Sequence, residues 1–95
     1  MAEVRLHGSL VCADDAQADL VRANLAAHVA LTRAEPGCLS FEVTPTQDGL
    51  VWRVEEFFAD SAAFRAHQQR VAASEWGRTT AGIERQYTVE GLEAE

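Results

Sequence analysis

The sequence has few basic residues and no long apolar run, and both features exclude some classes of protein. Among its 95 residues, 15 are acidic and 8 are basic, and the formal net charge is -7 at pH 7. The electrostatic field of a negatively charged protein repels phosphate backbones and anionic lipids. No stretch approaches the roughly 18 apolar residues that a membrane-spanning helix needs. We therefore expect neither a nucleic-acid partner nor a membrane partner.

The sequence also lacks targeting, metal-binding and cofactor-binding signatures. Its start has no basic segment followed by an apolar run, as a signal peptide would have, which favours a cytoplasmic location. Cys12 and Cys38 fall in different predicted strands without C-x-x-C or Cys/His spacing, so we expect both to be reduced and buried. There is no H-E-x-x-H, Gly-rich phosphate loop or G-x-S-x-G motif, and no resident cofactor or metal is expected.

What is present is the composition of a small folded protein. Hydrophobic residues make up 47% of the chain and charged residues 24%, which is ordinary for a globular domain. A chain this short can build one hydrophobic core and leaves much apolar surface near solvent. We therefore expect a single domain over residues 1–95.

The first half of the chain predicts a strand, a long helix and a second strand. Residues 3–12 alternate between apolar and polar side chains, as a half-buried strand does. Asp14 and Asp15 can cap a helix over residues 16–34, which contain no Gly or Pro and repeat apolar residues at helical spacing. Pro36 and Gly37 end that helix. Residues 38–44 alternate again and predict the next strand.

The second half predicts a hairpin partner, another helix and a last strand. Asp48 and Gly49 form a turn signal before a strand at residues 50–58. Asp60 or Ser61 can cap the second helix, whose pattern breaks at residues 74–77 before a strand at 83–89; the acidic tail, 90–95, is expected to fray. The order predicts an α+β, ferredoxin-like βαββαβ fold, with an antiparallel sheet and two helices on one face.

The strand at residues 50–58 differs from the others because it carries apolar side chains on both faces of the sheet. Val51, Trp52, Val54, Phe57 and Phe58 cannot all face one helical layer. The second face of such a sheet is normally polar, so something is expected to cover it. A second copy of the chain is the economical candidate, because two-fold homodimers are the commonest soluble oligomers.

Two segments resemble the antibiotic biosynthesis monooxygenase family. The first is Ala34-Glu35-Pro36-Gly37-Cys38-Leu39-Ser40-Phe41-Glu42-Val43, which is similar to the helix-to-strand junction of that family. The second runs from Trp52 through Glu56-Phe57-Phe58-Ala59-Asp60 to Ala66-His67. The resemblance implies a dimeric α/β-barrel with a pocket between sheet and helices in each subunit. It also implies quinol or polycyclic phenol oxidation without metal or flavin, although the family also includes haem-degrading relatives and proteins with no established activity.

His67 and Glu56 are the first candidates for chemistry. A phenol that loses its proton can pass an electron to oxygen, so the enzyme need supply a base, orientation and a dry pocket. His67 can titrate near neutral pH on the inward side of its helix, or it can be a hydrogen-bonded core residue. Glu56 can orient His67, or it can pair with Arg53 or Arg65.

The remaining candidates are aromatic residues and one arginine. Trp76 and Tyr87 join an aromatic body to a polar tip and can bond a phenolic oxygen, with core packing as the alternative. Arg85 can stabilise a phenolate or lie in solvent. The aromatic side chains proposed first for the core or dimer interface, and second for substrate contact, are Phe41, Trp52 and Phe64. His7 and His28 are expected to be structural or exposed.

Two functions from different classes follow, and an enzyme is favoured. The first is a cofactor-independent monooxygenase that acts on a quinol or related phenol. The second is a non-catalytic dimeric domain that binds a small molecule, in which His67 and Glu56 serve packing. Haem cleavage is a minor alternative, because the first strand offers His7 and Ser9 where that branch would require an asparagine.

Overall fold

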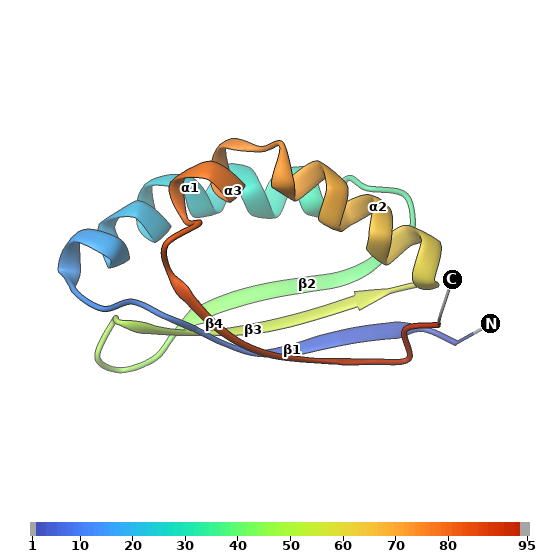
Figure 1. Ribbon diagram of the computed structural model, residues 1–95, viewed down its shortest axis with the longest axis horizontal. Coiled ribbons are helices and arrows are strands. Elements are labelled where there is room, and N and C mark those ends of the chain that lie inside the picture. Colours follow the sequence, from blue (N-terminus) through green and yellow to red (C-terminus); the bar gives the residue numbers. More distant parts are fainter. Residues whose placement is uncertain (1, 94–95) are drawn as a thin grey trace.

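The computed structural model describes residues 2–93 as a four-stranded antiparallel sheet with helices on one face (Figure 1). The strands lie in the order β2-β3-β1-β4. This is the predicted ferredoxin-like arrangement, with one addition, a short third helix before the last strand. The elements are β1 (Val4–Val11), α1 (Asp15–Arg33), β2 (Cys38–Pro45), β3 (Val51–Phe58), α2 (Ser61–Ala72), α3 (Glu75–Thr79) and β4 (Glu84–Glu90).

Polar side chains cap all three helices. Asp14 Oδ1 accepts a hydrogen bond from the Gln17 amide at 3.0 Å, and Asp60 Oδ1 accepts one from the Ala63 amide at 2.8 Å. Of the caps expected from the sequence, Asp14 and Asp60 are therefore the ones in use. Ser74 Oγ accepts from the Gly77 amide at 3.0 Å. Because of this cap, the predicted break at residues 74–77 is the start of α3.

The core lies between the sheet and the helices. Alternate residues of β1 and β3 face it, as their patterns predict, and β2 contributes Phe41. Leu39 does not follow its predicted alternation: it is 54% exposed. The pairing of β2 with β3 shifts between Cys38 and Ser40. Such a bulge inserts one residue and breaks the alternation of faces.

The other face of the sheet is mostly polar. Arg5 Nη2 lies 3.0 Å from Glu55 Oε2, and Arg5 Nη1 lies 3.4 Å from Glu90 Oε1. Val51 and Phe57 of β3 are half-buried on this face, so the prediction that β3 carries apolar groups on both sides is confirmed. These two apolar side chains lie at opposite ends of β3, with Arg53 and Glu55 between them on the same face.

Both cysteines are free thiols at opposite ends of the sheet. Cys12 is buried after β1, with its amide bonded to Leu50 O, whereas Cys38 is half-buried opposite Phe58. No helix within residues 2–93 is long and apolar enough to cross a membrane.

The tail is more ordered at its start than expected. Glu90 belongs to β4, and the Glu93 amide donates to Ser61 Oγ at 2.8 Å. Residues 94–95 of the predicted frayed tail lie outside the described residues.

Candidate functional site

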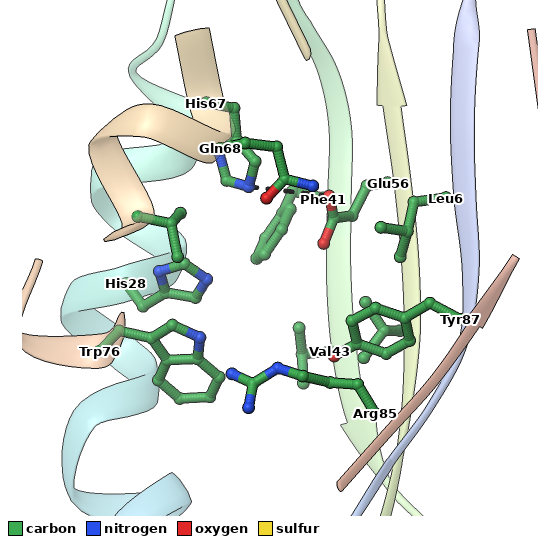
Figure 2. Close-up of a pocket in the computed structure, with 12 residues that line it drawn as sticks. Leu6, His28, Phe41, Val43, Glu56, His67, Gln68, Trp76, Arg85 and Tyr87 are labelled. Carbon is green, nitrogen blue, oxygen red and sulfur yellow. Dashed lines mark ion pairs between the residues drawn. The ribbon is translucent and has the colours of Figure 1, made fainter. Parts of the chain in front are cut away.

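A cavity of about 260 Å³ lies between the sheet and the helices (Figure 2). All four strands and all three helices contribute to its wall. Its polar and aromatic lining residues are His28, Phe41, Glu56, His67, Gln68, Trp76, Arg85 and Tyr87, and its aliphatic ones are Leu6, Val43, Val54 and Val71. A hollow lined by aromatic and aliphatic side chains, into which polar groups converge, is typical of small-molecule sites, and here the polar groups are unusually numerous.

Strand alternation and helix periodicity explain how the polar groups meet. Glu56 lies on β3 between Val54 and Phe58 on the core-facing side, and it is only 6% exposed. His67 is on the inward side of α2, one turn after Phe64, and is 3% exposed. The carboxyl group and the imidazole therefore reach the same end of the cavity from opposite layers (Figure 2).

His67 lies between two carboxyl groups. Its Nδ1 is 3.1 Å from Oε1 and from Oε2 of Glu35, and its Nε2 is 3.7 Å from Oε1 of Glu56. The first contact is a hydrogen bond, whereas the second is longer than one. Glu35 also accepts from Arg70 Nε, and Arg70 Nη2 donates to Thr32 Oγ1 at 2.9 Å. The bond to Glu35 places the imidazole proton on Nδ1 and leaves Nε2 as the basic atom.

The protonation of the pair follows from burial. Burial lowers the pKa of His67 from its usual value of 6.5, and the hydrogen bond and charge of Glu35 oppose that change. Burial, followed by the negative charge of Glu35, raises the pKa of Glu56 from 4.5 to about 8. At neutral pH, Glu56 is therefore mostly protonated and can donate a hydrogen bond.

His28 and Trp76 form a stacked pair at the helical wall. Their ring centroids are 4.4 Å apart and their planes differ by 2°. Burial, with a smaller contribution from the charges of His67, Arg70 and Arg85, lowers the pKa of His28 to about 3. The His28 imidazole is therefore neutral at physiological pH, because its charged form cannot be solvated there.

Arg85 and Tyr87 reach the cavity from β4. Arg85 Nη1 donates to Thr80 O at 2.6 Å and Ile83 O at 3.0 Å, and Arg85 Nη2 donates to Thr80 Oγ1 at 2.8 Å. These neutral acceptors hold the guanidinium without cancelling its charge. Burial raises the pKa of Tyr87 to about 12, although the Arg85 charge opposes this. Tyr87 thus remains a neutral phenol.

Gly8 allows β4 to lie this close to β1. It pairs with Tyr87, and a Cβ at Gly8 would overlap the Gln86 carbonyl oxygen. A side chain at position 8 would therefore push β4 outward and move Tyr87 relative to the cavity.

The structure brings most of the predicted site residues together. Those that line the cavity are His67, Glu56, Trp76, Tyr87, Phe41 and Arg85. Trp52 instead lines a separate, more open groove of about 590 Å³ between α1 and strands β2 and β3. Phe64 packs edge-on against Phe58, with centroids 5.7 Å apart, in the core. His7 lies on the polar face of the sheet, with Nε2 3.0 Å from Glu90 Oε1.

Three polar residues at or beside the cavity were not among the predicted site residues. Glu35 was named only within the segment that resembles the family's helix-to-strand junction, although it is the hydrogen-bond partner of His67. His28 was expected to be structural or exposed, and it is buried but lines the cavity. The sequence signal for His28 was its position on the inward stripe of α1. The signal for Gln68 was its position beside His67 on α2.

Within residues 2–93, no group of three His, Cys, Asp or Glu side chains is placed to hold a metal ion.

Comparison with known proteins identifies relatives over most of the chain. A family model for the antibiotic biosynthesis monooxygenases matches residues 7–79. No curated protein matches the sequence.

Solved structures share the fold. Rv0793 from Mycobacterium tuberculosis aligns over 99% of this chain and 98% of its own, with a TM-score of 0.73 and 21% identity. PA3566 from Pseudomonas aeruginosa aligns over 100% and 96%, with a TM-score of 0.72 and 22% identity. A Deinococcus radiodurans protein provisionally assigned to the antibiotic biosynthesis monooxygenases aligns over 97% and 94%, with a TM-score of 0.71 and 19% identity.

Proposed function

Because the chain belongs to the antibiotic biosynthesis monooxygenase family, we propose that it is a cofactor-independent monooxygenase that oxidises a quinol or polycyclic phenol with molecular oxygen. The observation that carries this proposal is the buried pair of His67 and Glu56 at one end of an aromatic-lined cavity. A base and a proton donor side by side in a site with little water are what phenol activation requires.

His67 is proposed as the base. Glu35 holds the Nδ1 proton, so the lone pair of Nε2 faces the Glu56 end of the cavity. A phenolic hydroxyl placed there passes its proton to Nε2. Glu56, mostly protonated at neutral pH, can then donate a hydrogen bond to the phenolate oxygen. Arg85 lies at the other end of the cavity, near His28 and Tyr87, and its positive charge acts to lower the pKa of both groups.

The oxidation balances without another reductant. The phenolate transfers one electron to oxygen, and the resulting radicals combine to form a carbon–oxygen bond at a ring carbon that carries hydrogen. The peroxide O–O bond then breaks: one oxygen atom stays as a carbonyl and the other leaves as water. The substrate loses two hydrogens, gains one oxygen and supplies all four electrons.

The cavity favours a small, flat substrate. Phe41 and the stacked pair of His28 and Trp76 supply ring surfaces against which an aromatic compound can pack. A volume of about 260 Å³ lies just below the usual range for pockets that hold drug-sized ligands. A compound of one or two fused rings is therefore the proposed substrate size.

A homodimer is part of the proposal. Val51 and Phe57 place half-buried apolar side chains at the two ends of β3 on the outer face of the sheet, and a second copy placed over this face would bury both. The ion pair of Arg5 with Glu55 lies on the same face, so the proposed interface is partly polar.

Non-catalytic binding is the second candidate. Glu35, Arg70 and Thr32 form a closed hydrogen-bond network with His67, as expected also of a residue kept for stability. In that case the cavity would bind a phenol without turning it over, and loss of His67 would lower thermal stability rather than a rate.

Oxygen-18 labelling tests the proposal. The purified protein is supplied with naphthohydroquinone under oxygen-18 gas, and the products are compared with those of a protein-free blank. We expect oxygen uptake above the blank and one labelled oxygen in the organic product. Spontaneous oxidation of naphthohydroquinone gives an unlabelled quinone and hydrogen peroxide instead. Uptake at the blank rate with unlabelled quinone would overturn the proposal.

A further inference from the structure

The open groove between α1 and strands β2 and β3 is separate from the cavity and larger than it. The groove has a volume of about 590 Å³, against about 260 Å³ for the cavity. Among residues 2–93, only Val43 lines both hollows, so its side chain lies in the wall between them. The chemistry proposed for His67 and Glu56 makes no use of the groove.

The middle of the groove is apolar. The positions of α1 that line it begin at residue 22 and recur at i+3, i+4, i+7, i+8 and i+11, the spacing of a single helix face. At a rise of 1.5 Å per residue, this stripe is roughly 17 Å long. An elongated apolar molecule can therefore lie along it. The apolar side chains of the groove are Leu25, Ala26, Val29 and Ala30 on α1, Val43 on β2 and Trp52 on β3.

An arginine of α1 lies at each end of this stripe and reaches across to the sheet. Arg33 reaches β2, where its Nη2 donates to Phe41 O at 2.9 Å and to Glu42 Oε1 at 3.0 Å. Arg22 reaches the turn between β2 and β3, where its Nη2 would lie 3.3 Å from a Cβ placed at Gly49. The apolar segment of the groove therefore runs between two guanidinium groups.

The two guanidinium groups differ in the donors that they leave open. Both Nε and Nη2 of Arg33 already donate to a backbone carbonyl, and the Glu42 carboxylate adds a negative charge beside them. Within residues 2–93, the one hydrogen-bond partner of Arg22 is Asp19, at 2.7 Å from Nη1. Both side chains of that pair are at least half exposed, and such surface pairs contribute little to stability. An anionic group can therefore bind at the Arg22 end.

We propose that the groove is a second binding site, and that it takes a straight-chain fatty carboxylate of medium length. The carboxylate accepts hydrogen bonds from Arg22, and the chain lies over Val29 and Trp52 toward Arg33. The charge of the groove fits an anion, because its lining includes two arginines and one carboxyl group, which is already paired with Arg33. Hydrogen bonds between guanidinium and carboxylate are strong, and burial of the chain supplies the remaining affinity.

Calorimetry with decanoate tests the inference. We expect wild type to bind decanoate at least about tenfold more tightly than decanol, which has the same chain without the charge. It should also bind decanoate about fivefold more tightly than octanoate, because two more methylene groups are partly buried. In Arg22→Gln the preference for decanoate over decanol is lost. Arg78→Gln keeps it, because Arg78 forms a similar exposed pair, with Glu75, outside the groove.

Two further measurements locate the bound chain. Trp52 lines the groove and Trp76 lines the cavity, and the sequence has no other tryptophan. In Trp76→Phe, decanoate should therefore change the fluorescence of Trp52 and saturate at the calorimetric affinity. Ala26→Phe fills part of the groove and should weaken decanoate binding about tenfold or more. Ala16→Phe, exposed on the same helix outside the groove, should not.

The contrary outcomes are distinct. Absence of saturable decanoate binding, or equal binding by wild type and Arg22→Gln, would overturn the inference. Binding that survives Ala26→Phe and leaves the fluorescence of Trp52 unchanged would place the chain elsewhere, as in the cavity. Self-association that Ala26→Phe abolishes and decanoate leaves unchanged would assign the groove to a second copy. Near-ultraviolet circular dichroism checks that each variant is folded.

The inference does not rest on the proposed monooxygenase, because it concerns a different hollow. Decanoate binding that depends on Arg22 would stand even if the protein consumed no oxygen with naphthohydroquinone. Oxygen uptake without any decanoate binding would contradict this inference alone.

Discussion

His67 Nδ1 lies 3.1 Å from both carboxylate oxygens of Glu35, a residue 32 positions earlier in the chain. Glu35 follows the C-terminal end of α1 and His67 lies in the middle of α2, so this bond ties the two long helices together at the cavity. In hydrolytic triads a carboxylate fixes the tautomer and orientation of a histidine in the same way. The bond therefore serves both stability and the proposed base.

Replacing Glu35 with Gln should lower the pKa of two other groups. The hydrogen bond and negative charge of Glu35 raise the pKa of His67, and the charge also raises the pKa of Glu56. Removing the charge should make the imidazole harder to protonate and the Glu56 carboxyl easier to ionise. Nuclear magnetic resonance titration of both side chains in Glu35→Gln measures this.

Glu42→Gln is the matched control for that titration. Glu42 is exposed and pairs with Arg33 at 3.0 Å, so its loss should leave both resonances unchanged. A His67 pKa that stays the same or rises in Glu35→Gln would show that Glu35 does not set the protonation of the imidazole.

Glu56 should make the protein less stable as pH rises. Its pKa is about 8 in the folded protein and 4.5 when unperturbed, so between these values the folded state holds a proton that the unfolded state has lost. The stabilising contribution is complete below about pH 4.5 and is lost as pH rises through 8. The difference between the two pKa values corresponds to at most roughly 5 kcal/mol in the free energy of unfolding.

Urea unfolding from about pH 5 to about pH 9 measures that loss in wild type and in Glu56→Gln, which cannot ionise. We expect the decline with pH to be smaller in Glu56→Gln. Glu55→Gln is the control, because Glu55 is adjacent in sequence but exposed on the opposite face of β3. Equal slopes in wild type and Glu56→Gln would mean that Glu56 ionises normally in the folded protein.

The sequence was sufficient to predict the sheet, both long helices and half of the residues that line the cavity. Alternation in β1 and β3 and the caps at Asp14 and Asp60 are local signals, and such signals specify elements well. Leu39 was misplaced because a bulge depends on pairing between strands, which no local pattern records.

The contacts between the site residues were harder to predict for a similar reason. Glu35 meets His67 only because two helices pack at a particular angle, and the Glu-Pro-Gly stop gave no sign of that contact. His28 lies on the inward stripe of α1, but from the sequence it was expected to be structural or exposed. Whether an inward histidine meets a partner or an open cavity is decided by the residues opposite, here Phe41 and Trp76.

Replacing Phe57 with Glu should dissociate the proposed dimer. Phe57 is half-buried on the outer face of the sheet beneath the guanidinium of Arg5, whose Cζ lies 5.6 Å from the ring centroid. In the dimer a carboxylate there would lose its hydration and would compete with Glu55 and Glu90 for Arg5. Sedimentation equilibrium should give twice the chain mass of 10.4 kDa for wild type and the single mass for Phe57→Glu.

Leu31→Glu is the control for the dimer, because it places the same charge on an exposed position of α1. It should sediment as wild type does. A wild-type protein that sediments as a monomer at micromolar concentration would remove the dimer from the account.

The most direct test of the account is the rate of oxygen uptake with naphthohydroquinone in wild type, His67→Gln and His7→Gln, all shown to be folded. Wild type should exceed the spontaneous rate, and His67→Gln should lose about a hundredfold or more of that excess, as removal of a general base does. His7→Gln should retain the wild-type rate, because His7 lies on the opposite face of the sheet from the cavity. Equal rates in wild type and His67→Gln would contradict the assignment of His67 as the base at this site.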